Sequence, residues 1–303
     1  MLQETVNSDV AGSTTSGHAK RLPVRKKREG NSRLFSIILH TLLIIGALIM
    51  ASPFVWMILT SLKDTSQAFS DPPVWIPNPF VWSNYPDSLN ALPFNLAYFN
   101  SIYIAVIVVA CQLVTCSMAG YAFARINFPG RSLIFVLFLA TMMIPFQLTI
   151  IPIFMTMKYL GWLDTHLSLI VPPALFSAFG VFLMRQFIMG IPHELEEAAI
   201  VDGANRWTIY IRVILPLLRA PLSALGIFSF LAQWNNFFMP LIMLNSSDKF
   251  TVPLMLNQFR GQYATEWTMV MAGSVIAVVP VLIVYILAQR YIIQGIAMTG
   301  LKS

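Results

Sequence analysis

The side chains of this chain that are best suited to chemistry lie together in one short segment. Residues 191–216 hold acidic groups at Glu194, Glu196, Glu197 and Asp202 together with two arginines, and apolar stretches lie on both sides. A charge in the middle of a bilayer costs at least about 2.5 kcal/mol, so a charged segment between apolar stretches is expected at a membrane surface. Its expected chemistry is polar contact with another molecule.

A second group of polar side chains lies inside the apolar stretches themselves. All are amides, which can hydrogen-bond a neutral polyhydroxylated solute, and no apolar stretch holds an acid of the kind that proton-coupled carriers use. The same amides also form hydrogen bonds between helices, so a purely structural role stays open. The candidate solute-pathway residues are Gln112, Gln147, Gln233, Asn235 and Asn236.

The sequence lacks the patterns that bind metals or nucleotides. The four histidines are scattered, Cys111 and Cys116 are not in a metal-ligand motif, and there is no glycine-rich phosphate loop. We therefore expect no catalytic residue, no metal ligand and no bound cofactor on this chain. The chain is not expected to be an enzyme, and any energy from nucleotide hydrolysis must come from a separate subunit.

The composition indicates an integral membrane protein. Of the 303 residues, 57% are hydrophobic and only 11% are charged, whereas about a quarter of the residues of a soluble domain are charged. The net charge of +6 would suggest nucleic acid as the partner of a soluble protein. Here the basic residues are expected to set the membrane topology instead, and no nucleic-acid partner is expected.

Six apolar stretches are long enough to cross about 30 Å of hydrocarbon as helices. Prolines inside several of them predict kinks, and broken spans tend to line a cavity. The fold class is therefore an all-α membrane protein with six transmembrane helices. The predicted spans lie near residues 34–62, 98–124, 132–157, 166–189, 219–244 and 268–290, and the prolines are Pro145, Pro152, Pro172, Pro173 and Pro280.

The basic residues predict that both termini are cytoplasmic. With this orientation, 15 of the 19 Lys and Arg residues fall on the cytoplasmic side, as the positive-inside rule requires. Residues 1–33 form a polar and basic tail that is expected to be disordered, and residues 34–303 form the transmembrane domain. The proline-rich loop over residues 63–97 is expected outside and without a long helix.

Two short helices are predicted in the charged segment. The first runs from about Pro192 to Val201, and Gly203 permits the turn after it. Asn205 is a plausible N-cap of the second helix. An apolar stripe at helical spacing follows on this helix, formed by Trp207, Ile211, Ile214 and Leu215.

The charged segment resembles the EAA loop of ABC-importer permeases. The resemblance rests on Glu197-Ala198-Ala199, Gly203 and the ending Val213-Ile214-Leu215-Pro216. It implies that residues 190–218 form a coupling loop that docks in a cleft of an ATP-binding subunit, where Ala198, Ala199 and Gly203 allow a close fit and Glu197 makes polar contact. The implied coupling residues are Glu197, Ala198, Ala199, Asp202, Gly203, Leu215 and Pro216. An amphipathic helix that only caps the bundle is the simpler alternative.

Other motifs resemble the carbohydrate branch of these permeases, with six spans and the type I importer fold. They include residues 119–125, Phe128-Pro129-Gly130 and residues 234–237, and residues 295–303 resemble a tail that reaches the ATPase. The resemblance implies a second homologous permease chain, two ATP-binding subunits that hold ATP and Mg, an extracytoplasmic solute-binding protein, and a place in the bilayer of a prokaryotic inner membrane.

The predicted function is that of a permease subunit that forms half of the pathway of an ABC importer for a sugar, oligosaccharide or polyol. A permease for glycerol phosphate or a peptide is the nearest alternative. An ion-coupled secondary carrier is an alternative of a different class, which predicts acidic residues or inverted repeats within the spans.

Overall fold

The computed structural model describes residues 29–262 and 266–300, and for residues 29–33, 260–262, 288 and 290–300 it describes the backbone alone. The chain forms two units, residues 1–52 and residues 53–303. Of the tail predicted over residues 1–33, residues 1–28 lie outside the described residues. The last five residues belong to helix α1, which begins at Glu29. The side chains of the predicted ATPase-reaching tail at residues 295–303 also lie outside the described part.

The first unit contains most of helix α1, which runs over Glu29–Ser61 and continues into the second unit through Pro53. The large apolar side chains from Leu34 to Met50 are exposed. A helix of this length and composition matches the first predicted span, since 28 residues from Leu34 to Ser61 are apolar enough to cross a membrane.

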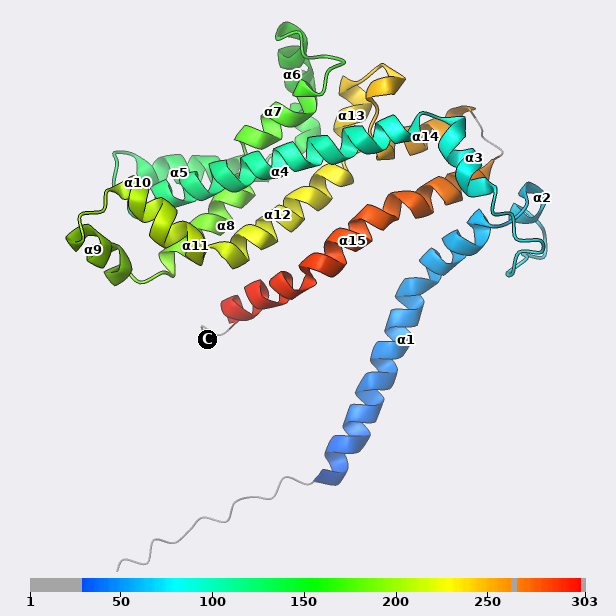
Figure 1. Ribbon diagram of the computed structural model, residues 1–303, viewed down its shortest axis with the longest axis horizontal. Coiled ribbons are helices and arrows are strands. Elements are labelled where there is room, and N and C mark those ends of the chain that lie inside the picture. Colours follow the sequence, from blue (N-terminus) through cyan, green and yellow to red (C-terminus); the bar gives the residue numbers. More distant parts are fainter. Residues whose placement is uncertain (1–28, 263–265, 301–303) are drawn as a thin grey trace, which may run out of the picture. The chain divides into compact units, whose positions relative to one another are not determined.

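Helix α4 (Phe94–Arg125) is the long central helix of the second unit. It packs against α7 (Leu167–Leu175), α8 (Ala178–Met189) and α12 (Arg219–Trp234), and α12 packs in turn against α15 (Trp267–Gly300) (Figure 1). Helices α3 (Asn84–Ala91) and α14 (Val252–Gln262) lie at the start of α4, whereas the charged segment and helix α5 lie at its end.

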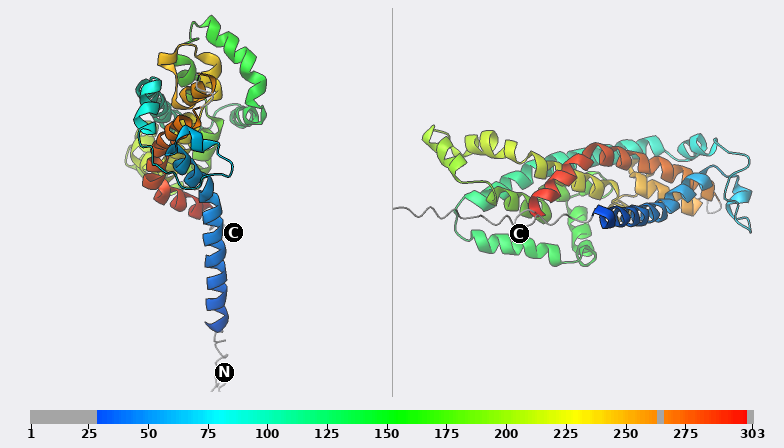
Figure 2. Two further views of the ribbon diagram at one scale, coloured as in Figure 1. Left: turned by 90° about the vertical axis from the view of Figure 1, so that its right-hand side faces the viewer. Right: turned by 90° about the horizontal axis from the view of Figure 1, so that it is seen from below.

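Proline breaks the third predicted span. Helix α5 (Arg131–Ala140) and a 3-10 turn (Thr141–Met143) are followed by α6 (Phe146–Tyr159), and the two parts are bent by 102°. Pro145 lacks an N–H and forces Ile144 into an extended conformation, so the helix ends there. Most side chains of α5 and α6 are exposed, and Figure 2 shows these helices beside the packed helices rather than among them.

The fourth span is broken as its prolines predict: α7 and α8 are separated after Pro172 and Pro173, and Ser177 caps α8. The fifth was predicted as one helix over 219–244, which is wrong: α12 ends at Trp234 and a separate short helix, α13, spans Phe238–Met243. The predicted kink at Pro280 does not interrupt α15, which continues through that residue.

By length and composition, four helical segments of the described chain can cross a membrane alone, and two bent pairs raise the number to six. The upper number equals the six predicted spans, but the second bent pair joins Arg206–Leu217 to α12 instead of joining α12 to α13. The loop after α1 contains only α2 (Thr65–Ala68) and α3, so it holds no long helix, as its prolines predict. A 3-10 turn over Ser247–Lys249 precedes α14.

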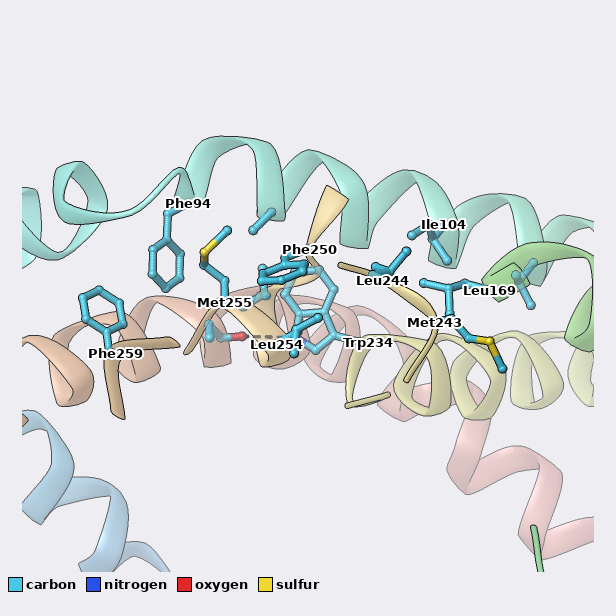
Figure 3. Close-up of a cluster of buried hydrophobic side chains, with 14 of the residues drawn as sticks. Phe94, Ile104, Leu169, Trp234, Met243, Leu244, Phe250, Leu254, Met255 and Phe259 are labelled. Atoms are coloured by element: carbon cyan, nitrogen blue, oxygen red, sulfur yellow. Dashed lines mark hydrogen bonds between the residues drawn. The ribbon is translucent and has the colours of Figure 1, made fainter. Parts of the chain in front are cut away.

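Two hydrophobic clusters hold the second unit together. In one, Phe94 of α4 and Trp234 of α12 pack with Phe259 of α14 (Figure 3). In the other, Met184 of α8 packs near the end of α4, where the helices approach so closely that a Cβ atom at Gly120 would lie 2.6 Å from the Cβ atom of Met184. Only glycine permits this crossing without a shift of one helix.

Candidate functional site

The coupling segment, defined as residues 190–218, contains the first predicted short helix as α9 (Glu194–Val201). The helix begins two residues later than predicted, with His193 as its N-cap. Gly203 has a φ of +82°, in the left-handed region that favours glycine. The Ala204 N–H donates to the Ala199 carbonyl at 2.9 Å, so this glycine ends the helix as predicted.

The second helical part follows the predicted cap. The Asn205 side chain accepts a hydrogen bond from the Thr208 N–H at 2.8 Å, and α10 (Arg206–Ile209) leads into a π-helical turn (Tyr210–Ile214) and α11 (Leu215–Leu217).

The four residues of the predicted stripe differ in exposure: Trp207 and Ile211 are 57% and 41% exposed, whereas Ile214 is buried and Leu215 half-buried. The π-turn at Tyr210–Ile214 interrupts the helical spacing along the stripe, and Ile209 and Tyr210 lie in the core.

The predicted coupling residues gather at one end of the second unit. Most of them are exposed, and apolar neighbours on the same helix are exposed with them: Val201 is 86% and Ile200 59% exposed. Charged and apolar groups therefore share one surface. Glu197, Ala198, Asp202, Gly203 and Pro216 are exposed, and Ala199 and Leu215 are half-buried.

Polar contacts join the coupling segment to helix α4. The hydroxyl groups of Ser117 and Tyr210 lie 2.7 Å apart, and the Nε atom of Arg125 lies 2.6 Å from a carboxylate oxygen of Glu196. We call Arg125, His193 and Glu196 the Arg125 cluster. Sequence reasoning assigned no role to Arg125, although its place at the end of an apolar stretch is a signal for a helix-end contact.

Two of the five candidate pathway residues line one pocket. Gln233 and Asn236 border a pocket of about 300 Å³ with Phe146 and the two prolines of α7, at the break between α12 and α13. No charged residue lines this pocket. Asn236 also accepts a hydrogen bond from the Met239 N–H at 3.3 Å, which places it at the start of α13.

The other three candidates lie apart from that pocket. Gln112 is buried, donates to the Pro173 carbonyl at 2.7 Å and accepts from the Ser229 hydroxyl at 2.5 Å. The first bond satisfies a carbonyl that the break after α7 leaves without a helical partner. Gln147 is exposed on α6, and the exposed Asn235, which follows the last residue of α12, donates to the Leu231 carbonyl of that helix.

A second polar cluster lies at the other end of α4 and was not predicted. We call Asp164, Ser246 and Lys249 the Asp164 cluster. The carboxylate of Asp164 accepts hydrogen bonds from the backbone N–H groups of Asn245 (2.9 Å) and Ser246 (3.0 Å) and pairs with the Lys249 ammonium at 3.0 Å. Hydrogen bonds from Ser246 and Asn245 hold the pKa of Asp164 far below its ordinary value.

Comparison with known proteins places the chain in a family. Residues 112–297 match the family described as binding-protein-dependent transport system inner membrane component. The arabinooligosaccharide permease AraQ of Halalkalibacterium halodurans is 39% identical over 62% of this chain and 67% of its own length.

Two longer matches cover nearly whole relatives. The lactose permease LacG of Rhizobium radiobacter is 32% identical over 87% of this chain and 95% of its own length. The sn-glycerol-3-phosphate permease UgpE of Yersinia enterocolitica is 32% identical over 88% of this chain and 97% of its own length.

A solved structure supports the fold as well as the family. A chain of a bacterial ABC transporter for the import of the acidic polysaccharide alginate matches with a TM-score of 0.75 and 27% identity, over 88% of this chain and 98% of that chain. The ion-coupled secondary carrier is excluded by this relationship. The chain belongs to the inner membrane components of binding-protein-dependent transport systems, and it is a multi-pass permease subunit of an ABC importer.

Proposed function

We propose that this permease forms half of the pathway for a sugar, oligosaccharide or polyol and is driven by an ATPase that docks on the coupling segment. The observation that supports docking most directly is the exposure of the Glu197–Gly203 stretch at one end of the bundle. Both chain termini and this end of α4 would then face the cytoplasm, in line with the distribution of basic residues.

The coupling surface has the composition of a protein contact rather than a lipid contact. Val201 and Ile200 expose apolar side chains beside the acidic residues Glu197 and Asp202. The acidic groups would meet the anionic headgroups of the cytoplasmic leaflet if α9 lay on the membrane as a cap. A cleft in a partner subunit accommodates both kinds of group.

The expected complex has four kinds of component besides the bilayer. This chain would pair with a second, homologous permease chain, with two ATP-binding subunits that hold ATP and Mg, and with a solute-binding protein on the opposite face. The chain itself would bind no cofactor. In this arrangement ATP-driven closure of the two ATPases would move the coupling segments and switch the pathway between its two states.

A neutral, hydroxyl-rich solute fits the pocket beside Gln233 and Asn236. Amide side chains hydrogen-bond hydroxyl groups, and the prolines and Phe146 offer an apolar wall. The relatives that transport arabinooligosaccharides and lactose favour the same class of solute. Gln112, Gln147 and Asn235 would act elsewhere along the pathway or, in the case of Gln112, between helices.

Glycerol phosphate is the second candidate solute, because the similarity to UgpE is as high as that to LacG. A phosphate ester would need cationic or other strong donors, and these would have to come from the second permease chain, since no charged residue lines the pocket described above.

The test begins with purification of the tagged chain from its host in mild detergent. We expect an ATP-binding subunit and a second permease to co-purify, and the purified complex in liposomes to import a labelled oligosaccharide in the presence of the binding protein and ATP. Import of labelled glycerol 3-phosphate alone would favour the second solute. A chain that purifies without an ATP-binding subunit would contradict the proposed coupling.

A paired substitution tests the pocket. Gln233→Leu should raise the solute concentration needed for half-maximal import, because the leucine removes a hydrogen-bonding group from the pocket. Ser223→Ala is the matched control, since Ser223 lies on the same helix, does not line that pocket and donates to the Arg219 carbonyl within α12. Equal import by the wild type and the Gln233 variant would assign Gln233 to helix packing.

A further inference from the structure

We propose that Arg125 is a positioning residue that passes the movement of helix α9 to the long helix α4. The inference rests on the proposed docking of an ATPase on the coupling segment. It concerns the next step, in which the displacement of a surface helix has to reach the membrane-spanning helices.

Arg125 joins three helices through one side chain. It is the last residue of α4, and its Nε atom lies 2.6 Å from a carboxylate oxygen of Glu196 in the first turn of α9. One terminal nitrogen donates to the carbonyl of Ile188 at 2.9 Å, in the last turn of α8. The same nitrogen donates to the carbonyl of Ile191 at 2.5 Å, and the other donates to the His193 Nε2 atom at 2.5 Å.

Some of these contacts are made to groups at the helix ends that have no hydrogen-bond partner within their own helix. The last carbonyl groups of a helix have no partner within it, and the first turn of the next helix favours an acidic side chain. The Arg125 guanidinium is planar and offers several donors, so its terminal nitrogen bonds to the α8 carbonyl while its charge pairs with the α9 carboxylate, an ion pair without a hydrogen bond at Nε. Its side chain is 3% exposed and that of Glu196 is 12% exposed, so water screens the pair little.

Helix α9 has little else to hold it to the transmembrane helices. None of its side chains is fully buried, and it packs mainly against α10 and the π-turn within the coupling segment. The next part of the segment is different, because Ile209, Tyr210 and Ile214 are buried in the core near Met184. A force on α9 therefore reaches α4 directly through the Arg125 cluster, whereas the Gly203 turn joins the other end of α9 to the rest of the coupling segment.

The experiment measures coupling separately from assembly. The complete importer with Arg125→Gln is purified, reconstituted with its binding protein, and assayed for the amount of co-purifying ATPase, for ATP hydrolysis, and for solute imported per ATP hydrolysed. Arg131→Gln is the matched control, since Arg131 begins the next helix, α5, and its side chain bonds within the described residues to the nearby Asn127 and Ile126.

The expected result is a loss of coupling without a loss of partner. In Arg125→Gln the ATPase should remain bound and active, while solute imported per ATP falls about tenfold, a size typical of coupling between sites. The solute imported per ATP by Arg125→Lys should lie between the values of Arg125→Gln and the wild type, because lysine keeps the charge but lacks the planar set of donors of arginine. Arg131→Gln should import as the wild type does.

A second substitution tests whether the pair acts as a unit. Glu196→Gln should lower solute imported per ATP in the same direction, and the double variant should be no worse than Arg125→Gln alone, since both changes remove one interaction. Additive losses would show that the two residues act independently and would overturn the proposed link.

The outcomes separate this inference from the proposed function. If the wild-type complex contains the ATPase and the Arg125→Gln variant imports as much solute per ATP as the wild type, the role of Arg125 is refuted while docking stands. The same holds if import falls only in proportion to the amount of assembled complex, because Arg125 would then be purely structural. If no ATPase is present with the wild-type chain, the proposed function itself fails.

Discussion

An ion pair lies near each end of helix α4, but the two clusters are built in different ways. At the Asp164 cluster several groups bind one carboxylate: two backbone N–H groups, a hydroxyl and the Lys249 ammonium. The Lys249 ammonium also donates to the Asp164 backbone carbonyl at 2.7 Å. At the Arg125 cluster a single guanidinium makes every contact.

Further bonds connect the Asp164 end to α4 itself. The Asn100 amide donates to the carbonyls of Asp248 and Phe250 at 2.9 and 3.0 Å, and Tyr103 contacts His166, whose ring lies 2.7 Å from the Lys249 carbonyl. Many bonds therefore hold the Asp164 end, whereas the polar contact between α9 and α4 is made by the Arg125 side chain. The difference indicates that the Asp164 end holds the turns in place and that the Arg125 end transmits movement.

The largest effect is expected from Gly203→Asp in the coupling segment. A side chain at this position is strained by the φ of +82°, and a charge would enter the proposed cleft, so import should be abolished and the ATPase should bind more weakly. Uptake and co-purification measure this, and circular dichroism should show unchanged helix content. Normal assembly and import in this variant would contradict the inference that the Arg125 end of α4 takes part in coupling and the Asp164 end does not.

The next effect concerns the helix crossing near the Arg125 end. Gly120→Leu places a side chain where a Cβ atom already lies 2.6 Å from that of Met184, so overpacking should destabilise the bundle by about 1–3 kcal/mol. The thermal unfolding midpoint in detergent measures the loss. Gly46→Leu is the control, because nothing lies within 4 Å of a Cβ atom there. An unchanged midpoint in Gly120→Leu would show that α4 and α8 separate easily.

A smaller effect is expected at the Asp164 end. Asp164→Asn keeps a residue that tolerates the observed φ of 52° but loses the charge, so stability should fall by only about 1 kcal/mol because the other bonds remain. Solute imported per ATP should not change. A loss of coupling as large as that expected for Arg125→Gln would show that both ends transmit movement.

The smallest effect is a dependence on pH. The folded-state pKa of Asp164 is lowered, so the carboxylate adds stability above its unfolded pKa of about 3.9, and this contribution is lost as the pH falls further. The difference in unfolding midpoint between the wild type and Asp164→Asn should therefore be constant near neutral pH and shrink below about pH 4. A difference that grows in acid would contradict the depressed pKa.

Local patterns were sufficient to predict several features of the fold. The apolar stretches predicted the candidate spans because length and hydrophobicity alone decide whether a helix can cross a bilayer. Pro145 predicted a break because proline removes a helical donor, and the turn at Gly203 and the cap at Asn205 follow from the conformations that these residues favour. The exposure of the Glu-Ala-Ala stretch likewise follows from its charges.

Features that depend on distant residues were missed or predicted wrongly. The end of α12 at Trp234 differs from the expected outline, and the π-turn at Tyr210–Ile214 was not predicted. The first depends on how the α12–α13 break packs, and the π-turn begins at Tyr210, which is buried in the core.

The sequence by itself determined which stretches are long and apolar enough to cross a membrane, which segment between them carries the charges and where the chain turns, since each follows from the transfer energy and backbone preference of neighbouring residues. Only the tertiary structure decided that Arg125 meets Glu196 and that Asp164 meets Lys249. These partners are far apart along the chain, and the packing of the helices between them brings their side chains together.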